Sequence, residues 1–272
     1  MFSKIFKYDF KYMFGYWWVA ALTATVLSVA GGFIIRGFSS ESIARNLFFD
    51  ILGGFGMFAV VITLILFPVC ISILALVRYY KNFYSDEGYL TFTLPVKRVS
   101  LLNSKILSNF IFMAMTLLVL FFDIYLMLVI GLQHFNADLG VVLAETLQEL
   151  KEIWNGYITS NLIIGFFALI FSSLMSINMA YLSITIGSII AKKHKVLAAI
   201  GIYYAINFGL GIIIQSINLI SLNAFASDQV TAQTVGGTFT GLSLTYMVVL
   251  AALAVVFYLV NLHCVQKKLN LS

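Results

Sequence analysis

Residues 78–105 read RYYKNFYSDEGYLTFTLPVKRVSLLNSK and join two long apolar runs. Ser85 is a residue type that caps helix N-termini, and the two carboxylates after it would lie at the positive end of a helix dipole. Pro95 lacks a backbone N–H and disfavours helical geometry at the residue before it, so a helix should end there. The stretch therefore predicts a short helix, residues 86–94, between two longer elements.

The apolar runs belong to an unusually hydrophobic chain. Of its 272 residues, 61% are hydrophobic and 10% are charged, and the mean hydropathy is +1.01. A soluble domain carries about 25% charged residues. Several uncharged runs exceed the ~20 residues that cross a hydrocarbon core, whereas a transmembrane barrel would show short alternating segments. We therefore expect an all-α, polytopic membrane protein that forms one transmembrane domain over residues 1–272.

The apolar runs predict six transmembrane helices. They cover approximately residues 16–35, 51–77, 106–130, 158–191, 196–222 and 244–264. Residues 1–15 mix cations with aromatic residues, which is typical of an interfacial helix. Residues 138–154 carry apolar side chains at helical spacing among acidic ones, so an amphipathic helix outside the membrane core is expected there. Residues 78–105 thus connect the second and third spans.

Lys and Arg residues are distributed unevenly between the two sides of this topology. Thirteen fall on one side: Lys4, Lys7, Lys11, Arg78, Lys81, Lys97, Arg98, Lys105, Lys192, Lys193, Lys195, Lys267 and Lys268. Three fall on the other: Arg36, Arg45 and Lys151. Because cytoplasmic loops carry the excess of Lys and Arg, both termini and residues 78–105 should be cytoplasmic in a plasma-membrane protein. The net charge of +5 comes from these cytoplasmic edges and does not indicate nucleic-acid binding.

A helix at residues 86–94 would carry apolar side chains on two faces. Phe83, Leu90 and Leu94 share one face, which can cover the ends of the helix bundle. Tyr89 and Phe92 point the other way. They can lie among lipid headgroups, as interfacial aromatic residues do, or enter a groove on a soluble partner.

A pattern within residues 87–105 resembles a known family. The residues that carry it are Glu87, Gly88, Leu90, Leu94, Pro95, Val96, Arg98, Leu101, Leu102, Ser104 and Lys105. They are similar to the E-G…L…LPVSR…LL…SK pattern between the second and third spans of permease subunits of type-2 ABC transporters. Lys97 departs from the family, which commonly has a small polar residue at that place.

The resemblance implies the type-2 ABC exporter transmembrane-domain architecture, with a coupling helix that docks on a cytoplasmic ABC ATPase subunit. It implies docking by Asp86, Glu87, Tyr89, Leu90, Phe92 and Leu94, and it favours docking over the headgroup interpretation of Tyr89 and Phe92. It further implies a second permease, as a homodimer or heterodimer, and a substrate path lined by the first, second and fifth spans. In related permeases the region that matches residues 223–243 is a partly re-entrant hairpin.

The sequence lacks the motifs of an enzyme. It contains no G-x-x-x-x-G-K-[ST] phosphate loop, so ATP hydrolysis by that route would have to occur in a separate partner chain. There is no H-E-x-x-H motif, and the three histidines are isolated from one another. We therefore expect no catalytic residue, no metal site and no cofactor in this chain itself, with ATP bound by the partner.

Two residues within the predicted spans have alternative interpretations. Asp123 is an acid inside the third span, where ionisable groups tend to face a partner or a cavity. It can contact a substrate or ion, or it can lie near the outer interface or bind a Ser or Asn on a neighbouring helix. Pro68 should kink the second span, and the kink can serve packing or act as a hinge.

Neutral amide side chains also occur in the fourth and fifth spans. These are Asn178, Asn207, Gln215 and Asn218. Interhelical hydrogen bonds explain such residues without a substrate.

These observations predict the permease subunit of an ATP-driven ABC exporter that contacts membrane lipids, ATPase subunits and a second permease. A membrane anchor or sensor subunit that transports nothing is the alternative. An ion-coupled carrier is disfavoured because the spans lack charged pairs.

The unequal charge distribution predicts the orientation of the chain. Single substitutions Asp86→Cys and Lys193→Cys should resist a membrane-impermeant thiol reagent in intact cells, because both positions are placed in the cytoplasm. Ser40→Cys and Gln148→Cys should react under the same conditions. Labelling at 86 or 193 from outside the cell would contradict the orientation.

Overall fold

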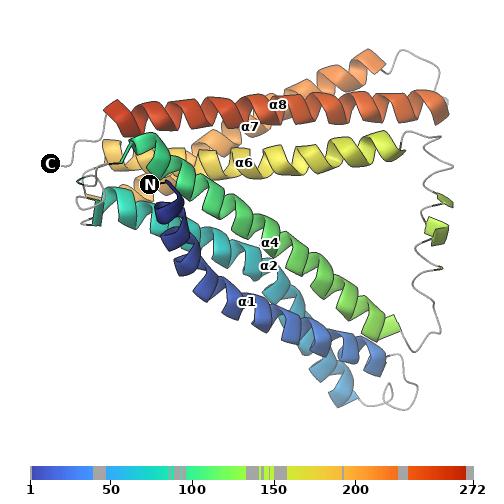
Figure 1. The fold of residues 1–272 in the computed structure, drawn as a ribbon. Coiled ribbons are helices and arrows are strands. Elements are labelled where there is room, and N and C mark those ends of the chain that lie inside the picture. Colours follow the sequence, from blue (N-terminus) through green and yellow to red (C-terminus); the bar gives the residue numbers. More distant parts are fainter. Residues whose placement is uncertain are drawn as a thin grey trace. The chain divides into compact units, whose positions relative to one another are not determined.

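The computed structural model describes residues 2–38, 47–85, 87–88, 93, 96–132, 141, 144–146, 148–149, 158–191, 193–225 and 232–267. Figure 1 shows its long helices. They are α1 (Phe2–Phe38), α2 (Leu47–Tyr84), α4 (Arg98–Leu132), α6 (Ile158–Ile190), α7 (Lys195–Phe225) and α8 (Ala232–Lys267). No strand occurs within the described residues. The all-α prediction is therefore confirmed.

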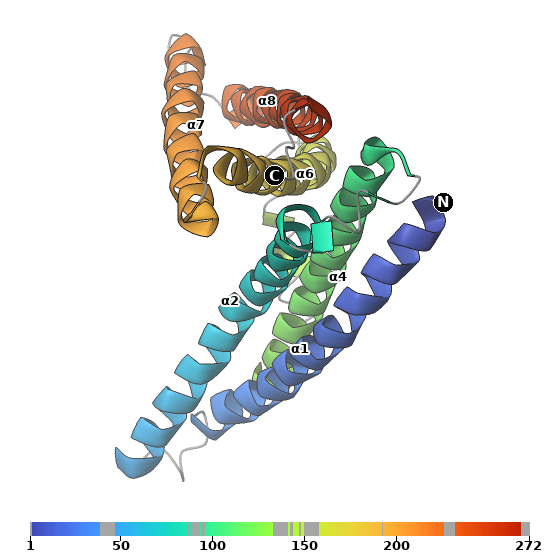
Figure 2. The same cartoon turned by 90° about the vertical axis from the view of Figure 1, so that its left-hand side faces the viewer.

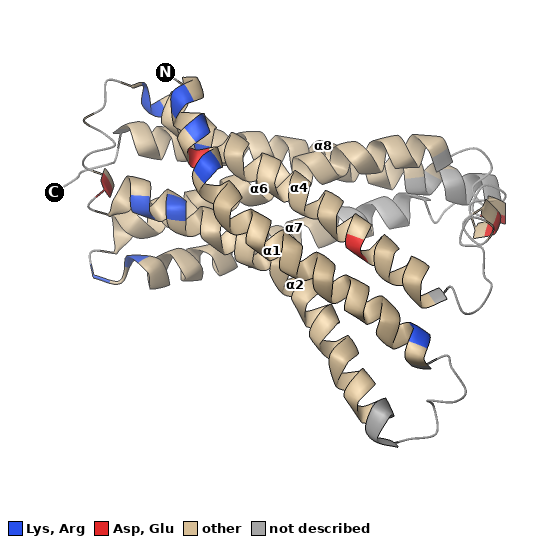
Figure 3. Cartoon of the chain, turned by 60° about the horizontal axis from the view of Figure 1, so that its bottom comes forward, with Lys and Arg blue, Asp and Glu red and all other residues tan. Residues whose placement is uncertain are grey.

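All six long helices are apolar enough to cross a membrane. Each contains an 18-residue window with a mean hydropathy between 2.0 and 3.0 and at most two charged residues. Figure 3 shows Lys and Arg mainly toward the helix ends, with long uncharged stretches between them. Because a membrane interior offers no water to backbone polar groups, uncharged helices of this length fit a membrane-embedded protein. The prediction of six spanning helices is confirmed.

The helix boundaries differ from the predicted ones at several places. α1 is one unbroken helix that includes residues 2–15 of the predicted interfacial segment and the first span. The described parts of 223–243 are the last residues of α7 and the first turns of α8. Within 138–154, residues 141, 144–146 and 148–149 are helical and exposed, and the others lie outside the described residues.

The chain forms two compact units, and each is described by itself. The first contains residues 1–77 and 107–147, and the second contains residues 78–106 and 148–272. The helices α2 and α4 therefore each contribute to both units.

In the first unit, α1, α2 and α4 lie side by side (Figures 1 and 2). Their core is apolar and consists of Met13, Trp17, Ala21, Ala24, Phe67, Ile71, Ala75 and Phe112. Trp17 is 6% exposed and its indole N–H donates to the Thr116 hydroxyl at 2.9 Å. Phe10 stacks obliquely on Phe112 with ring centroids 4.8 Å apart. The polar atom of the buried tryptophan is thus satisfied across the α1–α4 interface.

Glycines allow α1 and α4 to approach closely. A Cβ at Gly32 would lie 2.8 Å from the Ile130 side chain and 3.0 Å from the Met127 carbonyl oxygen. A Cβ at Gly131 would lie 2.8 Å from Ile35. Small residues at such crossings bring backbones together and increase dispersion contact, which drives helix association in lipid.

The second unit contains α6, α7 and α8 with the last turns of α2 and the first turns of α4. α6 and α7 approach closely at Gly187, where a Cβ would lie 2.6 Å from the Ala199 backbone nitrogen. Nearer the other end of α6, the Asn161 amide donates to the Thr240 hydroxyl of α8 at 2.9 Å. Close backbone contact and interhelical hydrogen bonds therefore hold the three helices together.

The Gly187 contact predicts a large effect from one added methyl group. Gly187→Ala should lower the thermal unfolding midpoint in detergent, because the new Cβ meets backbone rather than a side chain that can rotate; overpacking of this kind costs about 1–3 kcal/mol. Gly201→Ala on α7 is the matched control, since nothing lies within 4 Å of a Cβ there. Equal midpoints for the two variants would contradict the close approach of α6 and α7.

Candidate functional site

The connection between α2 and α4 carries the predicted ATPase-docking residues. Of these, the structure describes Glu87, which is helical and exposed. The other predicted docking residues, Asp86, Tyr89, Leu90, Phe92 and Leu94, lie outside the described residues. The candidate site is therefore built from the residues on either side of them.

The chain turns sharply at the end of α2. The Ser85 hydroxyl donates to the Lys81 carbonyl at 2.8 Å, so it satisfies the last turn of α2. The Gly88 N–H donates to the Ser85 carbonyl at 2.7 Å. A Cβ at Gly88 would lie 2.8 Å from the Phe83 carbonyl oxygen, which leaves no space for a side chain. Glycine at this position thus allows the chain from Ser85 to Gly88 to turn tightly at the end of α2.

A polar contact connects the two sides of this turn. The Asn82 side-chain amide lies between Glu87 and Lys105, the latter from the first turns of α4. With its nitrogen toward Glu87 Oε2 and its oxygen toward Lys105 Nζ, the distances are 3.1 and 2.5 Å. Lys105 is 5% exposed, and buried ammonium groups require such partners. The contact joins Glu87, one of the predicted docking residues, to α4.

Four side chains from three helices form a hydroxyl cluster, defined here as Tyr79, Tyr84, Thr185 and Asn261. The Tyr84 hydroxyl donates to Thr185 Oγ1 at 2.9 Å, and the Tyr79 hydroxyl lies 3.0 Å from the same atom. Asn261 Oδ1 lies 2.8 Å from Thr185 Oγ1. Tyr79, Thr185 and Asn261 are fully buried. A single threonine of α6 therefore connects α2 to α8.

Aromatic rings surround the hydroxyl cluster. Tyr79 stacks on Tyr181 of α6 with centroids 4.0 Å apart and an interplanar angle of 7°. It also stacks on Phe83, with centroids 4.8 Å apart. Phe83 is fully buried and lies in α2; Leu90 and Leu94, predicted to share its face, lie outside the described residues. Because an apolar environment strengthens hydrogen bonds, these rings should make the cluster a firm attachment.

The beginning of α4 attaches to α8. Arg98 Nη1 donates to the Val265 carbonyl at 2.9 Å and to the Gln266 carbonyl at 2.8 Å. The last carbonyls of a helix have no intrahelical donor and carry partial negative charge, so a guanidinium is favoured there. One turn further along α4, Asn103 Oδ1 accepts from the Tyr258 hydroxyl of α8 at 2.8 Å.

Asp123 lies on α4 in the first unit, whereas the hydroxyl cluster belongs to the second. It is fully buried, and neither carboxylate oxygen receives a hydrogen bond of regular geometry among the described residues. Thr25 of α1 faces it but donates its hydroxyl to the Ala21 carbonyl. The position of Asp123 near the outer interface and its contact with a substrate or ion both stay predictions.

Pro68 does not interrupt α2, and two of the neutral amides bond within their own helices. α2 continues through Pro68, whose carbonyl accepts from the Ser72 hydroxyl at 2.7 Å. The amides of Asn178 and Asn207 donate to Leu174 and Tyr203, each within its own helix. The interhelical bonds predicted for these amides are thus made instead by Asn161 and Asn261.

The hydroxyl cluster was not foreseen because its members are ordinary in sequence. Tyr79 resembles an interfacial aromatic residue, and Thr185 is one of many hydroxyl residues in α6. The available signal was Asn261, a neutral amide close to the C-terminal end of α8. Its partners lie 76 and 182 positions away in sequence, so only the packing of the helices reveals them.

Comparison of the chain with protein-family models, with curated proteins and with solved structures found no match.

Removing the Thr185 hydroxyl should weaken the attachment of the connection between α2 and α4. Thr185→Val keeps the shape but leaves buried tyrosine hydroxyls without their acceptor, which costs about 1–3 kcal/mol. A loss of about 1.4 kcal/mol makes local opening of the connection about tenfold more frequent. Trypsin should therefore cleave at Lys97 and Arg98 about tenfold faster in detergent.

The matched control is Thr245→Val, whose exposed hydroxyl donates only to the Gly241 carbonyl of its own helix at 2.9 Å. It should cleave at the wild-type rate. If both variants are cleaved equally fast, the hydroxyl cluster does not hold the connection.

Proposed function

We propose that the chain is the permease subunit of an ATP-driven exporter of the type-2 ABC class. It would pair with a second permease and with two cytoplasmic ATPase subunits. The observation that carries the proposal is the segment at residues 87–105, with its E-G…LPV…R…LL…SK residues, in the second connection of a six-helix membrane protein. The position in the topology makes the resemblance more specific than the residues alone.

The contacts on either side of the segment support a coupling role. The hydroxyl cluster attaches the end of α2 to α6 and α8, and Arg98 attaches the start of α4 to the end of α8. Glu87 and Lys105 meet through Asn82. A segment held at both ends by buried contacts transmits a displacement to the helices, whereas a loosely attached loop would absorb it.

The mechanism follows from this arrangement. Closure of the ATPases on ATP would push the docked segment, and its two anchored ends would carry that displacement into α6 and α8. The continuous helices α2 and α4 would move with it. Access to the path between the two permeases would change as a result, and ATP hydrolysis would reset the arrangement.

The proposal predicts which side chains hold the ATPase. Replacing Tyr89 and Phe92 together by Ala removes two aromatic anchors, which typically carry ~2 kcal/mol or more each at an interface. The variant should insert normally but lose the ATPase on co-purification. Normal recovery of the ATPase at matched expression would exclude the docking role.

The matched control removes the same two residue types from a surface exposed along α7. Tyr204→Ala with Phe208→Ala changes side chains that are 68% and 74% exposed. Since this face would lie within the membrane and not against the cytoplasmic ATPase, the control should retain its partner.

The alternative, an anchor or sensor subunit, predicts a different ATPase response. A permease should change ATPase turnover when both subunits are reconstituted in one membrane, and substrate should change it further. An ATPase rate that is independent of this chain would favour the anchor.

A further inference from the structure

A basic pocket lies beside the turn between α6 and α7. It has a volume of about 460 Å³ and is lined by Tyr80, Lys193, His194, Lys195, Val196 and Leu197. Tyr80 comes from α2, and the other residues come from the turn and the first residues of α7. All six belong to the second unit.

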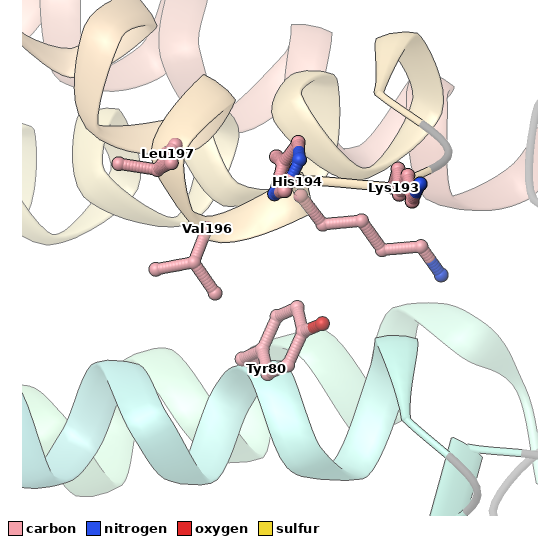
Figure 4. A pocket seen from close by; sticks show the side chains of 6 residues that line it. Tyr80, Lys193, His194, Val196 and Leu197 are labelled. Carbon is pink, nitrogen blue, oxygen red and sulfur yellow. The ribbon is translucent and has the colours of Figure 1, made fainter.

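The pocket has a polar side and an apolar side. Figure 4 shows Tyr80 opposite the turn, with its hydroxyl directed toward the side of Lys193, while Val196 and Leu197 lie on the other side. Lys193 forms no ion pair within the part of the chain that the structure describes, and neither does Lys195. Val196 and Leu197 are 55% and 67% exposed, so apolar surface continues from the pocket along α7.

We propose that this pocket binds the phosphate of an anionic phospholipid of the cytoplasmic leaflet. Two lysines, an imidazole and a phenolic hydroxyl supply donors for a phosphate group, and no acidic side chain among the described residues lines the pocket. The adjoining Val196 and Leu197 suit the beginning of an acyl chain. This apolar extension favours a lipid over a free phosphate, which would gain nothing from it.

The pocket is connected to the hydroxyl cluster. Tyr80 stacks on Tyr84 with ring centroids 6.4 Å apart, and Tyr84 donates to Thr185. A headgroup that fixes Tyr80 would therefore also restrain the end of α2. The binding proposal itself does not depend on the proposed transport function.

The test measures thermal unfolding of the full chain in neutral detergent with four added probes. Dioleoyl phosphatidylglycerol should raise the unfolding midpoint in a saturating manner, because a ligand of the folded state stabilises it. Dioleoyl phosphatidylcholine, which has the same acyl chains and no net charge, should not. Inorganic phosphate and glycerol 1-phosphate should act only at much higher concentration. Equal effects of glycerol 1-phosphate and phosphatidylglycerol at equal concentration would overturn the lipid assignment.

Two double variants then locate the site. Lys193→Gln with Lys195→Gln should weaken the apparent affinity for phosphatidylglycerol about 30-fold, since each lysine near a lipid phosphate contributes about fivefold. Lys4→Gln with Lys7→Gln is the control; it removes two exposed lysines from α1 and should change the affinity much less. Equal weakening in both variants, or none in either, would overturn the pocket as the binding site.

Discussion

The fold depends on the requirement that backbone N–H and C=O groups find partners where there is no water. Long helices satisfy this requirement internally except in their first and last turns, and the six helices have 31 to 38 residues. Because lipid is as apolar as leucine, burial of apolar side chains does not hold such helices together. Association must come from close approach and from polar contacts, and both are found at specific residues.

Close approach and polar contact are distributed differently along the helices. Glycines bring backbones together within the apolar stretches, as at Gly32 and Gly131 in the first unit. Many of the hydrogen bonds between helices of the second unit involve residues 79–105, the part of the chain next to the predicted docking segment. An arrangement that served stability alone would not need to concentrate them there. The concentration fits a segment that must remain attached while a partner pushes on it.

Much of the fold could be read from the sequence, because hydropathy reports directly on the solvent of each segment. The six spans and the all-α class follow from uncharged runs of sufficient length. The boundary predicted between residues 15 and 16 is absent, and α1 continues through it, since aromatic and basic residues continue a helix as readily as they begin one. The partners of Thr185 and Asn261 could not be read, because hydrogen bonding between helices depends on their relative rotation. Neither hydropathy nor motif encodes that rotation.

The contacts that hold residues 79–105 do not involve the buried carboxylate of Asp123. Asp123 belongs to the first unit, whereas the hydroxyl cluster and Arg98 belong to the second. The two units share α2 and α4, and both helices change unit directly beside residues 78–106. Under the proposed coupling, the continuous helices α2 and α4 would be the covalent path by which a displacement at residues 78–106 reaches the first unit.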